Sequence, residues 1–112
     1  MPTSATSFEK FSNDVFTVHG KRYKSGVWLV SKDVCRELEL SGHSYHVKGQ
    51  SGRRKNGKPY RIEGVGKANW RQCGRTVLVN RCGVDMLVGK SRSEMARKFW
   101  KWAEEKIYKA PM

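Results

Sequence analysis

The chain has 112 residues, of which 23 are Lys or Arg and 10 are Asp or Glu, so its formal net charge at neutral pH is +13. This length suits one domain with a single modest core, and 38% apolar residues with 11% aromatics favour a folded chain over a disordered one. The composition excludes a membrane-spanning protein, because no apolar run is long enough to cross a bilayer, and a disulfide scaffold, because there are three cysteines and no C-x-x-C pair.

The first residues predict a short tail and then a meander of strands. Residues 1–7 are polar and are expected to form a disordered N-terminal tail, while residues 8–112 form a single domain. Short β-prone runs then alternate with glycine-containing turns, His19-Gly20 and Ser25-Gly26. The predicted strands are Phe16–Val18, Lys21–Lys24 and Val27–Val30.

The next stretch, Val27–Leu40, predicts a buried strand that runs directly into a short amphipathic helix. Ser31 is placed as the N-cap, because its hydroxyl can accept a hydrogen bond from an unpaired amide of the first turn. Asp33 adds negative charge where the helix dipole favours it. Val34, Cys35 and Leu38 recur at helical spacing and predict the face that packs on the core.

The middle of the chain predicts a protruding basic β-hairpin over Gln50–Ile62. Asn56-Gly57 is a strong signal for a two-residue hairpin turn, in which Lys55 and Lys58 would face each other. Pro59 has no amide hydrogen and therefore indicates an edge strand. On either side, His43–Gly49 fits a short helix or an extended segment, and Glu63–Gly74, with three glycines, predicts a loop that carries Trp70.

The C-terminal third predicts a strand and two helices. Thr76–Val79 is β-prone, Asn80 can cap the helix that follows, and Gly89 suits the C-terminal cap of that helix. A capping box, Ser91-Arg92-Ser93-Glu94, then opens the last helix. An apolar stripe on this helix indicates a lid on the sheet, although the same stripe could form a homodimer face: Met95, Ala96, Phe99, Trp100, Trp102, Ala103 and Ile107. The predicted class is α+β, with a small antiparallel sheet, made of the meander and the basic hairpin, packed with about three helices, the last one long and amphipathic.

Two blocks of this sequence resemble the BRO-N domain, the N-terminal domain of baculovirus repeated-ORF proteins and of many phage antirepressors. The first is Gly26–Leu40, with its Gly, Trp, apolar strand and Lys-Asp-Val-Cys helix start. The second is Thr76–Ile107, where the family spacing is matched by Leu78-Val79-Asn80, Gly83, Leu87, Ser91-Arg92, Phe99 and Trp102. The resemblance implies a viral or prophage protein in the host cytoplasm with a DNA-binding or antirepressor role. Between the blocks, Gln50–Gly74 is basic where the family is usually acidic, which favours direct contact with nucleic acid.

The basic segment 48–75 is the predicted binding site. It holds nine Lys or Arg side chains against the single acid Glu63, a net charge of +8, so phosphates should attract it and counterion release should make binding salt-dependent. Two aromatic side chains in the segment could stack on unpaired bases, which leaves RNA open beside the favoured partner, DNA. The predicted contact residues are Lys48, Arg53, Arg54, Lys55, Lys58, Tyr60, Arg61, Lys67, Trp70, Arg71 and Arg75.

Other functions are less well supported by the sequence. A zinc site from His43, His46, Cys73 and Cys82 is conceivable, but the spacing does not match a common zinc finger. The simpler interpretation places Cys35 and Cys82 in the core and the histidines at the surface, so no metal or other cofactor is expected. An enzyme is not indicated either, because the acids are scattered and neither histidine has an evident carboxylate partner. The alternative function is an antirepressor-type inhibitor whose basic face binds an acidic surface of a repressor or another regulator.

Overall fold

The structure is a computed structural model that describes residues 8–40 and 43–108, so the predicted tail, residues 1–7, lies outside the described residues. The elements confirm the α+β class. In chain order they are β1 (Glu9–Ser12), β2 (Thr17–Tyr23), β3 (Gly26–Val30), α1 (Ser31–Glu37), α2 (His43–Lys48), β4 (Gln50–Arg53), β5 (Pro59–Ile62), the 3₁₀ turn η2 (Lys67–Asn69), β6 (Trp70–Cys73), β7 (Thr76–Val79), α3 (Arg81–Lys90), α4 (Met95–Ala103) and the π-helical turn η3 (Glu104–Tyr108).

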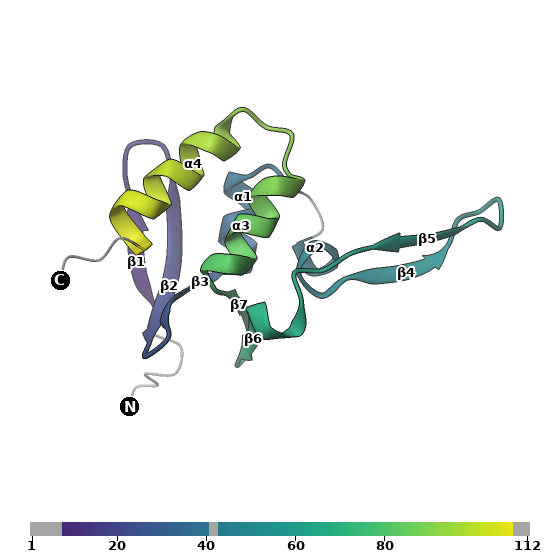
Figure 1. The fold of residues 1–112 in the computed structure, drawn as a ribbon, viewed down its shortest axis with the longest axis horizontal. Helices are drawn as coiled ribbons and strands as arrows, with labels where there is room; N and C mark the ends of the chain where they lie inside the picture. The colour runs from purple at the N-terminus through teal and green to yellow at the C-terminus, as the bar shows by residue number, and fades with distance from the viewer. Residues whose placement is uncertain (1–7, 41–42, 109–112) are drawn as a thin grey trace.

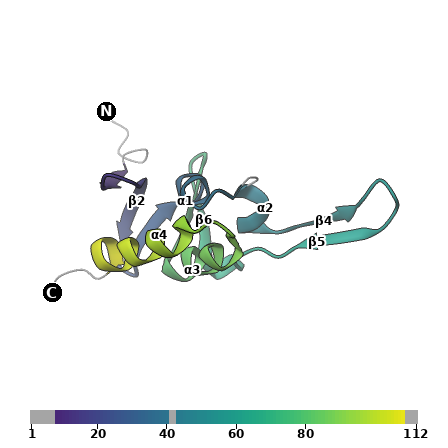
Figure 2. The same ribbon diagram turned by 90° about the horizontal axis from the view of Figure 1, so that it is seen from above.

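The strands form two separate antiparallel sheets. Five of them make one sheet in the order β1-β2-β3-β7-β6, and β4 and β5 pair only with each other. Helices α1, α3 and α4 lie over the larger sheet, whereas the β4–β5 hairpin extends away from this body (Figure 1). Figure 2 shows the same separation from above. The predicted basic hairpin is therefore present, as a two-stranded ribbon of its own.

The core lies between the helices and one face of the five-stranded sheet. Phe99 of α4 is fully buried, with its ring 5.3 Å from Phe16 and 5.8 Å from Trp102 between centroids. The predicted apolar stripe of α4 continues through η3 to the buried Ile107, which confirms the long last helix as a lid on the sheet. A smaller cluster, Trp28, Val30 and Leu78, lies on the opposite face of the sheet.

The meander is present, but its strands differ from the prediction. The expected turn at His19-Gly20 is wrong, because β2 runs unbroken from Thr17 to Tyr23. Gly20 pairs with Leu29, and a Cβ atom at Gly20 would lie 2.7 Å from the carbonyl oxygen of Trp28. This glycine is therefore required by close packing between strands rather than by a turn. The first strand of the meander is β1, which the sequence did not predict.

The predicted helix caps are only partly correct. Asn80 caps α3 as expected, since its Oδ1 accepts a hydrogen bond of 2.8 Å from the amide of Gly83. Ser31 is instead the first residue of α1, buried and without a capping bond, while Asp33 accepts bonds from the amide and the ring of His19. Gly89 lies inside α3 rather than at its end.

The start of α4 differs from the predicted capping box. The hydroxyl of Ser93 accepts a 3.1 Å hydrogen bond from the amide of Met95, so Ser93 rather than Ser91 satisfies the first turn. The hydroxyl of Ser91 accepts a 3.1 Å hydrogen bond from the amide of Ser93 and donates to the carbonyl of Leu38 at 2.7 Å, which ties the α3–α4 connection to the end of α1.

Two further segments of the middle region have regular structure. The stretch that fitted either a helix or an extended segment contains α2, and the loop expected over Glu63–Gly74 contains η2 and β6. β6 pairs with β7 through a tight turn, from Trp70 opposite Val79 to Cys73 opposite Thr76. Within the described ranges, no helix is long and apolar enough to cross a membrane.

Candidate nucleic-acid interface

The β4–β5 hairpin ends in a bulged turn. The amide of Gly57 donates to the carbonyl of Arg54 at 2.8 Å, and the amide of Arg54 donates to the carbonyl of Lys58 at 2.8 Å. Gly57 has a φ of +84°, which completes a three-residue loop with a glycine bulge. The predicted two-residue turn is therefore wrong by one residue, because Asn56 keeps a negative φ and Lys58 pairs with Arg54 instead of Lys55.

Buried residues and backbone hydrogen bonds attach the base of the hairpin to the rest of the domain. Val47 and Val65, just outside the two strands, are both buried, and the amide of Val65 donates to the carbonyl of Val47 at 2.9 Å. The ammonium of Lys90, near the end of α3, donates to the carbonyls of His46 and Glu63, one on each side of the hairpin. Burial lowers the pKa of Lys90. The direction of the hairpin is thus set by the domain core.

Gly64 tests this attachment. A Cβ atom there would lie 2.5 Å from the carbonyl oxygen of Val47, against backbone that cannot move aside. We expect Gly64→Ala to lower the free energy of unfolding by about 1–3 kcal/mol, as overpacking does, measured by urea denaturation. The control is Gly89→Ala on α3, where a new Cβ meets nothing within 4 Å and should be neutral or stabilising. Equal stability of G64A and wild type would contradict the tight base.

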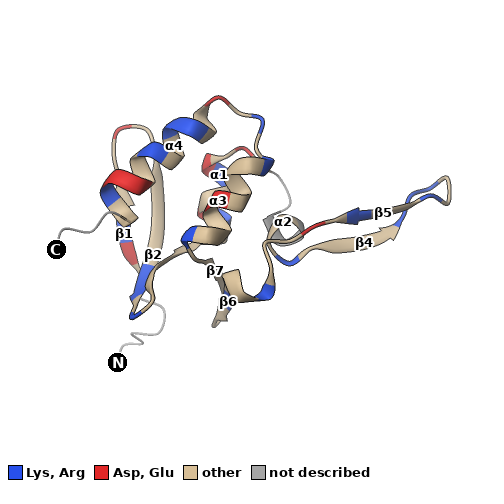
Figure 3. Ribbon diagram, in the orientation of Figure 1, with Lys and Arg blue, Asp and Glu red and all other residues tan. Residues whose placement is uncertain are grey.

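Most of the predicted contact residues lie on the hairpin itself. Its Lys and Arg residues are exposed and lie at the end of β4, on the turn and on β5 (Figure 3): Arg53, Arg54, Lys55, Lys58 and Arg61. Tyr60 is half-buried, with the Arg54 guanidinium 5.8 Å from its ring centroid. No Asp or Glu occurs between Gln50 and Ile62, so the ribbon presents positive charge only.

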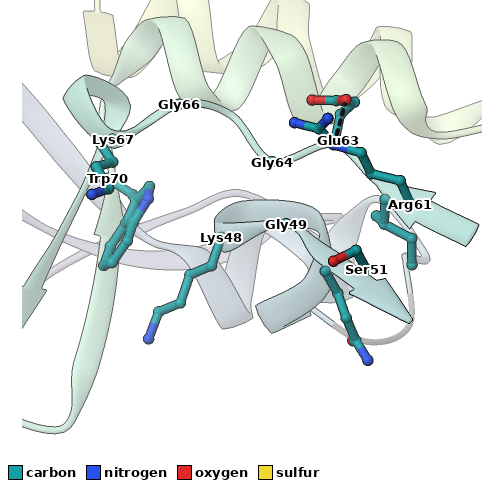
Figure 4. Close-up of a pocket in the computed structure, with 11 residues that line it drawn as sticks. Lys48, Gly49, Ser51, Arg61, Glu63, Gly64, Gly66, Lys67 and Trp70 are labelled. Carbon is teal, nitrogen blue, oxygen red and sulfur yellow. Dashed lines mark ion pairs between the residues drawn. The ribbon is translucent and has the colours of Figure 1, made fainter. Parts of the chain in front are cut away.

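Three more predicted residues meet at the base of the hairpin. Lys48, Lys67 and Trp70 line a groove of about 690 Å³, together with Arg61 and several backbone segments (Figure 4). The Lys48 ammonium lies 5.0 Å from the centroid of the Trp70 ring. The groove continues the basic surface from the ribbon to the body and includes an aromatic plane.

Arg61 has one acidic neighbour in this groove. Its Nε lies 3.0 Å from Oε1 of Glu63, and the two side chains are 74% and 72% exposed. Exposed pairs of this kind contribute little and are screened by salt. A phosphate or a base edge could therefore replace Glu63 as the partner of Arg61 at low cost.

The last two predicted residues lie elsewhere. The guanidinium of Arg71, on β6, lies 4.5 Å from the ring centroid of Tyr23 and 4.8 Å from that of Trp28, on the sheet face opposite the helices. Arg75 is exposed in the β6–β7 turn. The predicted set thus divides into a hairpin-and-groove group of nine residues and a pair on the β6–β7 hairpin.

The described cysteine and histidine side chains do not form a metal site. Cys35 is buried, as predicted, and burial raises the pKa of its thiol to about 11. Cys82 was expected in the core but is exposed, because it lies in the first turn of α3 on the side away from Val84 and Leu87. Among the residues that the structure describes, no three His, Cys, Asp or Glu side chains form a group that could hold a metal ion. The side chain of His43 is outside that description.

Two features of the interface were missed in the sequence. Gln50 and Ser51 line the groove beside the charged residues, and the alternation of side chains along β4 could have placed them there. The role of Lys90 as a brace had no local signal, since its partners lie 27 and 44 positions away in the chain.

Comparison with known proteins gives one match. The family model described as the BRO family, N-terminal domain, matches residues 16–109, which include the sheet from β2 onward, all the helices and the basic hairpin. No curated protein and no solved structure matches the chain. Since the match extends over most of the sequence, this chain belongs to the BRO family and contains its N-terminal domain.

Proposed function

We propose that the protein binds duplex DNA through the β4–β5 hairpin and the groove at its base, as a non-enzymatic regulator of viral or prophage type that acts in the host cytoplasm. The observation that carries this proposal is the hairpin itself, a ribbon with five exposed cationic side chains and no acid between Gln50 and Ile62, held out from the body. The membership of this chain in the BRO family supports a regulatory role of this kind.

The shape of the hairpin favours double-stranded DNA. A two-stranded antiparallel ribbon is one of the few protein elements that fit the major groove, which is about 12 Å wide. Cationic side chains on both strands and on the turn could then contact phosphates of the two DNA strands. Trp70 and Lys48 at the base would lie against the flanking backbone, where the aromatic ring could also stack on an unpaired base.

A gel-shift series tests the function. We expect the protein to bind random-sequence duplex more tightly than single-stranded DNA or RNA of the same length, since the ribbon suits a wide groove. The logarithm of affinity should fall linearly with the logarithm of salt, with a slope of about −0.9 for each phosphate contacted. A pull-down from lysate treated with nuclease is run beside it.

The outcomes separate the candidate partners. Preference for single strands would point to stacking on Trp70 and against the duplex assignment. If no nucleic acid binds even at low salt, the proposal fails, and capture of an acidic regulator would favour the antirepressor-type inhibitor, which needs the same positive charge.

A further inference from the structure

The β4–β5 hairpin has two different faces. Because side chains alternate along a strand, the pairing register places one set of four residues on each face. We call the first the tyrosine face, formed by Gln50, Gly52, Tyr60 and Ile62. We call the second the arginine face, formed by Ser51, Arg53, Pro59 and Arg61.

The tyrosine face is already occupied by its own contacts. The ring of Tyr60 lies across Gly52, where an added Cβ would be 3.0 Å from the ring. The amide of Gln50 donates to the Tyr60 hydroxyl at 3.1 Å, and the guanidinium of Arg54 stacks near the same ring. The Gln50 side-chain nitrogen and the Tyr60 hydroxyl therefore have partners within the hairpin, and the Tyr60 ring covers Gly52.

The arginine face leaves its hydrogen-bond donors free for a ligand. Ser51, Arg53 and Arg61 are all exposed. The structure gives Arg53 one bond, from Nη1 to the carbonyl of Gly57 at 3.1 Å, and pairs the Nε of Arg61 with exposed Glu63. Each guanidinium carries five N–H donors in a planar fork, so both retain enough donors for a bidentate contact.

The spacing of these two arginines matches the spacing of bases. Arg61 lies opposite Ser51, two residues from Arg53, so the two form a diagonal cross-strand pair. Such diagonal positions are roughly 7–8 Å apart. Successive bases on one strand rise about 3.4 Å, so this separation corresponds to about two base-pair steps. The clamped base of the hairpin fixes the direction of the ribbon backbone before DNA arrives, which reduces the entropy lost on binding.

Resting on the proposed function, we propose that the arginine face enters the major groove, where Arg53 and Arg61 each bind the O6 and N7 atoms of a guanine. The two guanines would lie about two base-pair steps apart. Arginine is the side chain that most often makes this bidentate contact, because its fork matches the two acceptors. Arg54, on the turn beside the tyrosine face, would contact phosphate only.

Atom-specific base replacement tests this assignment with the full chain. Three pools of one randomised duplex are made enzymatically, with guanine, with 7-deazaguanine, which lacks N7, or with hypoxanthine, which lacks only the minor-groove amino group. Binding is measured by fluorescence anisotropy. We expect 7-deazaguanine to weaken wild-type binding about tenfold and hypoxanthine to leave it nearly unchanged.

Charge-conserving variants locate the contact. Arg53→Lys and Arg61→Lys keep the attraction for phosphate but lose the planar fork, so the double variant should show a much smaller difference between the guanine and 7-deazaguanine pools than the wild type. The matched control Arg54→Lys should retain the tenfold difference. Equal wild-type affinity for guanine and 7-deazaguanine would overturn the base contact while leaving DNA binding intact, and loss of the difference in R54K alone would overturn the choice of face. Failure of all pools to bind would instead refute the proposed function.

Discussion

Charge reversal at Arg53, Arg54 and Lys58 is expected to lower the affinity for duplex DNA by at least roughly 100-fold at about 0.15 M salt. Each phosphate contact that is lost reduces the release of condensed counterions, so the loss of Arg54 and Lys58 should flatten the salt slope by about 1.8 units. The loss of Arg53 removes the proposed contact with guanine. All three side chains are exposed, and the hairpin buries no core side chain between its strands. The free energy of unfolding should therefore stay within about 0.5 kcal/mol of wild type.

A matched variant separates local contact from total charge. The control variant carries Arg92→Glu, Arg97→Glu and Lys98→Glu. It reverses the charge of the same number of arginines and lysines, two and one, at exposed positions on α4 and the connection before it. Because this region lies over the sheet and away from the hairpin (Figure 1), the control should lose much less affinity. If both triple variants weaken binding equally, the net charge of the molecule, rather than the hairpin, accounts for binding.

Phe99→Ala is expected to lower the free energy of unfolding by about 3–5 kcal/mol, the range for removing a buried aromatic ring. Phe99 is fully buried where α4 crosses the sheet, in edge contact with Phe16 and packed against Trp102. Phe99 belongs to the main buried cluster, so its neighbours would have to leave their own packed positions to fill the cavity. Such a loss is a large fraction of the 5–15 kcal/mol typical of a domain. Urea denaturation with an unchanged m-value measures it.

Phe99→Leu is the control for this substitution. Leucine refills much of the space and keeps the surface apolar, so its cost should be below that of alanine, at about 1–2 kcal/mol. An F99A protein as stable as F99L would show that α4 does not close the core in solution.

Local signals in the sequence predicted the elements whose hydrogen bonds are local. Asn80 caps α3 because its side chain reaches an amide three residues ahead, and the stripe of α4 reflects one helical period. Gly20 misled the prediction, since its requirement comes from the Trp28 carbonyl of the neighbouring strand. The glycines around β6 predict a loop, whereas the structure has a strand there that pairs with β7. Long-range packing overrode local propensity in both cases.

The density of positive charge in the sequence predicted which segment forms the candidate site, but it did not predict on which face of a strand each residue lies. Density of Lys and Arg located the hairpin, and Asn56-Gly57 located its tip to within one residue. Charge alone could not separate Arg71 from the rest, because its place against Tyr23 and Trp28 depends on which face of β6 it occupies. The division into a tyrosine face and an arginine face likewise required the register between β4 and β5.

The separate two-stranded sheet also bears on solubility. Within the described residues, the outer edges of β4 and β5 pair with no further strand, and an open edge can add a strand from another molecule and begin aggregation. Pro59 removes one donor from its edge, and the surrounding Lys and Arg side chains repel a second copy. The cations that attract DNA therefore also keep free molecules apart. A mutation that changes the charge of this ribbon is therefore expected to affect both DNA binding and solubility.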